Sequence, residues 1–117
     1  MELIGPSGNV TIPGLIDTGA DTSILPFGYA SLLGYTTSSL RSSQAQQVQG
    51  LADVYEATES SIAWIPGAEQ ITFTTLPIFI QGALNALWGR RDFLQAFPVA
   101  FFEARKEFVV TLGDVEK

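Results

Sequence analysis

Glycine and proline interrupt this chain at short intervals, and their spacing limits the length of any regular element. The 117 residues include 11 glycines and 6 prolines, and the segments between them are rich in β-branched and aromatic residues. Such residues favour extended strands, whereas glycine and proline favour turns and strand ends. The pattern therefore predicts an all-β fold built from many short strands.

The expected elements follow the same punctuation. We expect a turn at 5–9, strands at 10–16 and 23–25, one helical turn at 27–34, a loop or exposed strand at 38–47, a long hairpin at 48–64, a turn at 65–70 and an apolar strand pair at 71–80 bent at Pro77. "VAFFE" and "EFVVTL" predict a closing hairpin, and Phe93, Leu94 and Phe97 recur at helical spacing. The length predicts a single domain over residues 1–117.

Composition excludes several kinds of chemistry. The chain has no cysteine and no histidine, so it cannot form disulfides, a Ser-His-Asp triad or a zinc site with histidine or cysteine ligands. Any acid–base catalysis would therefore depend on carboxylates, and we expect neither a metal nor an organic cofactor.

The charge balance restricts the partners. The net charge is −6, with 12 acidic and 6 basic side chains, which leaves no basic surface for a nucleic acid or an anionic membrane. No apolar run has the length of a membrane span, and "MELIGPSGN" lacks the pattern of a signal peptide. We therefore expect no nucleic-acid or membrane partner, and either a cytoplasmic location or an origin as a domain cut from a larger precursor.

An aspartate follows the apolar run "GLI" and is itself followed by "TGAD". Gly19 permits a tight turn and leaves a backbone N–H free to face the carboxylate of Asp17. The hydroxyl of Thr18 can fasten the turn to neighbouring backbone, and Ala20 leaves the approach unobstructed. These residue types suit a carboxylate that is held rigidly and faces a partner.

Two carboxylates can perform a reaction that one cannot. When two aspartates lie within hydrogen-bond distance, like-charge repulsion keeps one proton between them, so one acts as base and the other as acid. The chain contains one D-T-G sequence. The second aspartate would therefore come from another copy of the chain, related by a two-fold axis.

Two motifs resemble those of a known family. "LIDTGADTSILP" resembles the active-site motif of the retropepsin-like aspartic proteases, and "ALWGRRDFLQAF" is similar to the second motif, with apolar residues, glycine, arginine and then a short helix. The motifs lie about seventy residues apart, as in single-domain retropepsins. The resemblance extends over residues 15–112 and is closest to bacterial or retroelement members. It implies an all-β closed barrel of the acid-protease fold, with one lobe per chain and a short helix near the C-terminus.

The resemblance also implies a function and roles for the first motif. The chain would be an aspartic endopeptidase that acts as a homodimer on polypeptides bound in an extended conformation. Asp17 would be the catalytic carboxylate, with one from each subunit. Thr18 would interlock the two active-site turns, and Gly19 would contact the substrate backbone or the carboxylate.

Further roles fall on the substrate-binding and supporting residues. Ala20 and Asp21 would lie near the substrate backbone, and Asp21 would pair with Arg90 or with the adjacent Arg91. Gly89 would allow the second-motif helix to pack closely beneath the site. A flap over the substrate would contribute four residues: Val48, Gln49, Gly50 and Leu51.

Other interpretations of the same residues stay open. Asp17 could be a turn residue, Asp17 and Asp21 could suggest a calcium site that lacks further oxygen ligands, and the two arginines could be a surface pair. D-x-G also begins phosphate-binding loops in two-lobed ATPases, for which this chain is too short. The tryptophans and phenylalanines are interpreted as core. Because Gly50 is the one glycine in the expected flap, the alternative function is an inactive retropepsin-like domain that binds peptides or only dimerises.

Overall fold

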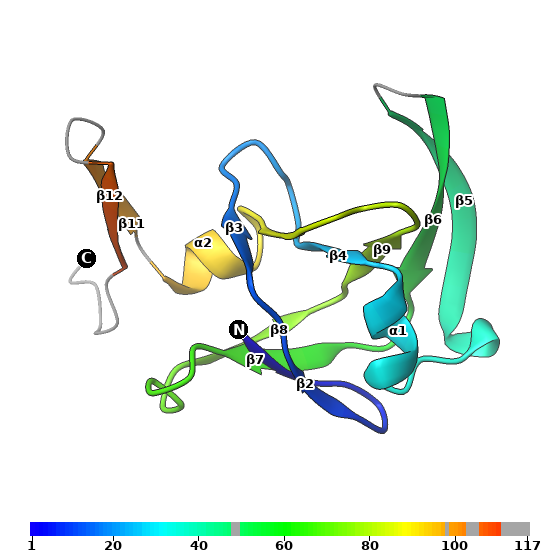
Figure 1. Ribbon diagram of the computed structural model, residues 1–117. Helices are drawn as coiled ribbons and strands as arrows, with labels where there is room; N and C mark the ends of the chain where they lie inside the picture. The colour runs from blue at the N-terminus through cyan, green and yellow to red at the C-terminus, as the bar shows by residue number, and fades with distance from the viewer. Residues whose placement is uncertain (48–49, 98, 103–105, 111–117) are drawn as a thin grey trace.

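The computed structural model describes residues 1–47, 50–97, 99–102 and 106–110, which form three β-sheets and a few short helices (Figure 1). The helices are α1 (Gly28–Leu32), the 3-10 turn η1 (Thr37–Ser39) and α2 (Phe93–Ala96). The predicted all-β fold and the predicted helix near the C-terminus are both confirmed. No helix in the described part of the chain is long and apolar enough to cross a membrane.

The first sheet has four strands and contains the beginning of the chain. Its order is β2 (Asn9–Thr11), β1 (Glu2–Ile4), β7 (Ser61–Trp64) and β8 (Thr72–Thr75), and every neighbouring pair is antiparallel. Leu3 and Ala63 lie opposite each other in this sheet, and both are fully buried. Both edges of β1 are therefore occupied, by β2 on one side and β7 on the other.

The second sheet has six strands and connects the two motifs. Its order is β3 (Gly14–Ile16), β10 (Ala86–Trp88), β4 (Ile24–Pro26), β9 (Ile78–Ile80), β6 (Gly50–Ala57) and β5 (Leu40–Gln47). The pairs β3–β10 and β4–β9 are parallel, and the other neighbours are antiparallel. Because β3 and β10 are parallel neighbours, the residues that follow them emerge at the same edge of the sheet.

The third sheet is the hairpin of β11 (Val99–Phe102) and β12 (Glu107–Val110). It lies beyond α2, at the opposite end of the molecule from β5 and β6 (Figure 1). The predicted closing hairpin is thus confirmed, while its connection at 103–105 lies outside the described residues.

The core lies between the two larger sheets and the helices. Its fully buried large side chains include Leu3, Ile12, Leu25, Leu33, Phe79 and Phe97. The ring of Phe73 makes edge contacts with both Phe93 and Phe97, which holds α2 against β8. The interpretation of the aromatic residues as core is confirmed for most of these rings, although Phe108 is exposed.

Tyr35 joins the end of α1 to the first sheet. Its buried hydroxyl lies 2.6 Å from Ser61 Oγ and donates to the carbonyl oxygen of Glu59 at 2.8 Å. Burial raises the pKa of Tyr35 above its ordinary value of 10, and the nearby Glu59 charge raises it further, whereas the Ser61 hydrogen bond opposes the shift.

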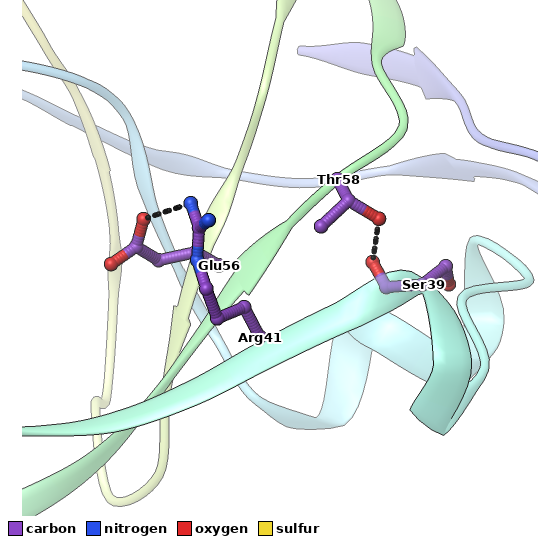
Figure 2. A network of polar contacts seen from close by, with 4 residues as sticks. All are labelled: Ser39, Arg41, Glu56 and Thr58. Atoms are coloured by element: carbon purple, nitrogen blue, oxygen red, sulfur yellow. Dashed lines mark hydrogen bonds and ion pairs between the residues drawn. The ribbon is translucent and has the colours of Figure 1, made fainter.

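The long hairpin is formed by β5 and β6, so the predicted hairpin at 48–64 is wrong. β6 pairs with β5 and β9, whereas β7 belongs to the other sheet. The chain turns between the sheets at Thr58, whose backbone N–H and hydroxyl both donate to the carbonyl of Ser39 at 2.9 Å. Arg41 and Glu56 form an ion pair at 3.3 Å near the same end (Figure 2).

Two prolines mark places where the chain leaves one sheet for another. The predicted strand at 10–16 is split at Pro13 into β2 and β3, and Pro77 separates β8 from β9. In both cases the two strands belong to different sheets. Proline lacks the N–H that a strand ladder requires, so each ladder ends there.

The turn at 5–8 packs against the C-terminal end of α1 through backbone atoms. The N–H of Ser7 donates to the carbonyl of Leu33 at 3.2 Å. A Cβ at Gly8 would lie 1.9 Å from the carbonyl oxygen of Leu32, and Gly34 has a φ of +89°. This contact therefore depends on the absence of side chains on both sides.

Candidate active site

Asp17 directly follows β3, beside the end of β10. Ile16 lies opposite Trp88 in the parallel pair, and the N–H of Asp17 donates to the carbonyl of Trp88 at 3.0 Å. This bond extends the β3–β10 contact by one residue. The first-motif aspartate and the second-motif Gly89 therefore leave the sheet side by side, although they are far apart in the sequence.

The turn after Asp17 folds back onto its carboxylate. Gly19 donates its N–H to Asp17 Oδ1 at 2.8 Å, and Ala20 donates its N–H to the Asp17 carbonyl at 3.2 Å. The side chain of Asp17 is half-buried, whereas Thr18 and Gly19 are exposed. The predicted contact between the Gly19 N–H and the carboxylate is confirmed, and the carboxylate is held on one oxygen.

Asp21 pairs with Arg90. Arg90 Nη2 donates to Asp21 Oδ1 at 2.9 Å, and the two side chains are 60% and 64% exposed. The backbone contributes two further bonds, from the Arg90 N–H to the Ala20 carbonyl at 2.9 Å and from the Arg91 N–H to the Asp21 carbonyl at 2.7 Å. Arg90 thus provides the side-chain partner, while Arg91 binds Asp21 through the backbone.

Gly89 makes the closest approach between the two motifs. A Cβ at this position would lie 2.5 Å from both the carbonyl carbon and the carbonyl oxygen of Thr22. Its N–H donates to Ser23 Oγ at 3.2 Å. A residue with a side chain would therefore displace the turn from β10, which supports the predicted role of Gly89 in close packing.

A buried carboxylate that the sequence interpretation missed lies behind these contacts. Asp92 is 9% exposed and accepts four hydrogen bonds. Its Oδ1 accepts from the Ser23 hydroxyl at 2.9 Å and the Phe93 N–H at 2.7 Å, and its Oδ2 accepts from the Ser23 N–H at 3.1 Å and the Thr75 hydroxyl at 2.7 Å. The Asp92 carboxylate thus connects the residue before β4, the end of β8 and the first turn of α2.

Of the three side chains Asp92, Ser23 and Thr75, only Asp92 has a recognisable signal in the sequence. Asp92 directly precedes the apolar helix residues in "RRDFL", and aspartate is a preferred residue at the N-cap of a helix. Ser23 and Thr75 carry no comparable signal, because their role depends on a contact with a residue distant in the sequence.

The predicted flap corresponds to the β5–β6 hairpin. Gly50 and Leu51 begin β6, opposite Gln47 and Gln46 of β5, whereas Val48 and Gln49 lie outside the described residues. β6 pairs with β9 only through 54–56, so the rest of the hairpin extends past the sheet, as Figure 1 shows. The structure therefore brings the base of the hairpin into the same sheet as β3.

A hollow of about 240 Å³ lies beside β3. Its lining includes Leu15 and Leu84, which are both exposed, together with Pro26 and Tyr29. Leu15 precedes Asp17 by two residues. The lining is mostly apolar, so this surface suits an apolar side chain better than a charged one.

The possible calcium site finds no support in the geometry. Among the described residues, no three carboxylates gather closely enough to hold a metal ion. The carboxylate of Asp21 is bonded to Arg90, and that of Asp17 accepts the Gly19 N–H. Calcium needs several more oxygen ligands than this arrangement offers.

Comparison with known proteins identifies the family. The family model of retroviral aspartyl proteases matches residues 5–101, which include both motifs and the strands that carry them. Searches of curated proteins and of solved structures found no match. The match covers most of the chain, and it agrees with the mostly β fold. The chain therefore belongs to the retroviral aspartyl protease family.

Proposed function

We propose that the chain acts as a homodimeric aspartic endopeptidase, in which Asp17 of each subunit supplies one of two catalytic carboxylates. The observation that carries this proposal is the position of Asp17, on the turn of the first motif and beside the second motif, with one carboxylate oxygen bonded to the Gly19 N–H at 2.8 Å. Membership of the family supports aspartic protease chemistry, and residues 1–117 would form one protease domain.

The proposed reaction uses the two carboxylates and a water molecule. At working pH the pair shares one proton, because two adjacent carboxylates cannot both ionise easily. The ionised Asp17 takes a proton from water, whose oxygen attacks the peptide carbonyl carbon. The protonated Asp17 of the other subunit gives its proton to the carbonyl oxygen. In the second step, the Asp17 that took a proton from water gives it to the nitrogen as the C–N bond breaks, and the other Asp17 takes a proton from a hydroxyl of the tetrahedral intermediate. The products are a carboxylic acid and an amine, and the pair again shares one proton.

The substrate would lie extended between the turn and the hairpin. Gly19, Ala20 and Asp21 would contact its backbone from one side, and the 48–51 segment would do so from the other. The ion pair with Arg90 supports this role of Asp21, because it fixes the carboxylate direction. The hollow lined by Leu15 and Leu84 supports a preference for apolar side chains beside the cleaved bond.

Cleavage of a peptide library by the wild type and by Asp17→Asn tests the role of Asp17. We expect the variant to keep its fold and its dimer and to lose about a thousandfold or more in kcat/KM. The control is Glu59→Gln, which removes one exposed carboxylate charge away from the turn. Cleavage by Asp17→Asn at the wild-type rate would overturn the mechanism.

A mixing experiment tests whether two Asp17 residues are needed. Asp17→Asn protein is added in an equal amount to a fixed amount of wild type, under conditions in which subunits exchange. If both aspartates are required, only dimers of two wild-type subunits are active, and random pairing lowers the total activity to about half that of the same amount of wild type alone. Activity that stays constant would show that one Asp17 is sufficient, and would exclude the shared site.

The alternative function is a domain that binds peptides or dimerises without cleaving them. It predicts that fluorescent peptides bind equally well to the wild type and to Asp17→Asn, and that no cleavage appears in the library at any pH between 3 and 7. Detection of products that require Asp17 would reject this alternative.

A further inference from the structure

Strand β5 is the longest outer strand of the two larger sheets, and no other described strand pairs with its outer edge. It is hydrogen-bonded to β6 in a continuous register from Leu40–Ala57 to Gln47–Gly50. In Figure 1 it lies at the margin of the ribbon. A long edge strand presents a row of backbone donors and acceptors that a further strand can bind.

The register shows which backbone groups of β5 face outward. The carbonyl of Asp53 accepts the N–H of Gln81 at 3.1 Å, so the backbone polar groups of Asp53 point away from β5. Gln44 lies opposite Asp53, and two opposite residues of an antiparallel pair point their backbone groups either toward each other or both away. The N–H and carbonyl of Gln44 therefore face outward, and by alternation so do those of Ser42 and Gln46.

The other outer strands of these two sheets are protected, whereas β5 is not. β2 and β3 have three residues each, and β8 has four. Pro13 stands between β2 and β3, and Pro77 follows β8. Short length and proline are common devices that prevent pairing at a sheet edge. β5 contains no proline, and its one charged residue, Arg41, is paired with Glu56 at 3.3 Å.

The charge distribution favours a second copy of this chain as the partner. The chain carries a net charge of −6, but residues 22–52 contain no acidic side chain and one basic side chain, Arg41. β5 therefore lies in the part of the sequence where two copies repel each other least. The rest of the strand is uncharged and rich in glutamine, whose amide side chains form ladders when identical strands pair.

The strand can pair with itself about a two-fold axis. An axis at Ser43 or at Gln44 pairs residues 40–46 or 41–47 of the two copies, whereas an axis nearer either end pairs fewer residues. Both registers place outward-facing residues opposite one another, as an antiparallel ladder requires. The two Arg41 residues then lie about 14 or 20 Å apart along the strands, beyond the screening length of about 8 Å in physiological salt.

The outer edge of β5 is remote from the candidate site. The six-stranded sheet ends in β3 at one edge and in β5 at the other, and Asp17 directly follows β3. A second copy at β5 would extend the sheet away from Asp17. This contact therefore differs from the one that would bring two Asp17 residues together.

We propose that β5 pairs antiparallel with β5 of a second copy, so that the six-stranded sheets of the two copies become one continuous sheet. The association is additional to the shared-site dimer, and it does not rest on the proposed function. Because β5 is one strand of the β5–β6 hairpin, the pairing would also hold the outer edge of the segment that is expected to cover the substrate.

Single cysteines test the pairing directly. The chain has no cysteine, so a disulfide in a single-cysteine variant forms only between two copies. Ser43→Cys and Gln44→Cys each place the new residue on one of the two axes, where opposite Cα atoms lie about 4.5–5.5 Å apart, within the range of a disulfide. We expect one or both to cross-link about tenfold or more faster than Gln70→Cys, which replaces another exposed glutamine. If neither exceeds Gln70→Cys, the proposal is wrong.

Hydrogen exchange of the outward-facing Ser42 amide provides a second test. In the wild type this amide should exchange about 100-fold more slowly at millimolar than at low micromolar protein concentration, because pairing protects it. Gln44→Pro removes an outward N–H that the β6 ladder does not use, so we expect a folded protein without this protection. Gln44→Ala is the matched control, because it loses the side chain and keeps the N–H. Exchange in the wild type that is independent of concentration would overturn the proposal.

The outcomes separate this inference from the proposed function. If cysteines on β5 cross-link rapidly and no peptide is cleaved, the β5 interface stands and the protease function is wrong. If peptides are cleaved in a manner that requires Asp17 but neither cysteine cross-links, the function stands and the β5 interface is wrong. Protection of the Ser42 amide only after addition of another polypeptide would assign the edge to that polypeptide and reject the second copy.

Discussion

Ser23 binds Asp92 through both its backbone N–H and its hydroxyl, at 3.1 and 2.9 Å, although 69 residues separate them. Ser23 directly precedes β4 and follows the Asp17 turn, and Asp92 caps α2. Both partners are buried. The two motifs are thus joined by a polar contact in the interior as well as by the exposed Asp21–Arg90 pair.

Replacement of Asp92 by alanine should strongly destabilise the protein. Asp92→Ala leaves buried donors of Ser23 and Thr75 without their acceptor, and removes the cap of α2. We expect a loss of about 3 kcal/mol or more in the free energy of unfolding, measured with urea. Asp92→Asn keeps one acceptor oxygen and should lose about 1–2 kcal/mol. The control is Asp53→Ala, which removes an exposed carboxylate. If Asp92→Ala lowers the free energy of unfolding by less than Asp53→Ala does, the proposed stabilising role of the Asp92 carboxylate is wrong.

The Asp21–Arg90 pair should matter more to substrate binding than to stability. Both side chains are largely exposed, so the pair is screened by water. A double-mutant cycle with Asp21→Asn and Arg90→Gln should give a coupling of about 0.2–1 kcal/mol in urea unfolding. If Asp21 contacts the substrate backbone as proposed, KM should rise about tenfold in Asp21→Asn. A variant with wild-type KM and greatly reduced stability would reverse this assignment.

A methyl group at Gly89 should separate the two motifs. Its Cβ would lie 2.5 Å from backbone atoms of Thr22, which cannot move without shifting the turn. We expect Gly89→Ala to lose about 2 kcal/mol or more in stability and most of any peptidase activity. Gly28→Ala is the control, because a Cβ there meets nothing within 4 Å. The free energy of unfolding of Gly28→Ala should equal that of the wild type or exceed it by up to about 1 kcal/mol.

The stability of the protein at alkaline pH should depend on Tyr35. Burial raises the pKa of Tyr35 in the folded state above the ordinary value of 10. The folded state therefore favours the protonated phenol. The contribution of this preference to the free energy of unfolding is complete below pH 10 and declines as the pH rises above 10. Between pH 8 and 11, the free energy of unfolding measured with urea should fall more steeply with pH for the wild type than for Tyr35→Phe. Parallel curves for the two proteins would contradict this prediction.

The sequence predicted the local features of the fold and two contacts in the candidate site. The positions of α2 and the closing hairpin followed from periodicity and turn residues, and the Gly19–Asp17 contact followed from the steric freedom of glycine. The pairing of Asp21 with an arginine came from the family resemblance. These features depend on a few adjacent residues or on a motif, so a single sequence contains enough information to predict them.

The errors concern which strand pairs with which. The segment at 48–64 was predicted as one hairpin, but the chain turns at Thr58, which is hydrogen-bonded to Ser39 of η1. The segment at 10–16 was predicted as one strand, whereas Pro13 separates β2 and β3, which belong to different sheets. Asp92 was missed because burial of its carboxylate depends on Ser23 and Thr75. Each of these features arises from contacts between distant segments, which periodicity does not reveal.

The backbone contact between the 5–8 turn and α1 has a consequence for the evolution of this chain. Gly8 and Gly34 are sterically constrained, although neither contributes an atom to the proposed chemistry. Selection should preserve them almost as strictly as Asp17. In an alignment of homologues these glycines would appear as invariant columns, and invariance in this region would record the packing of a turn rather than catalysis.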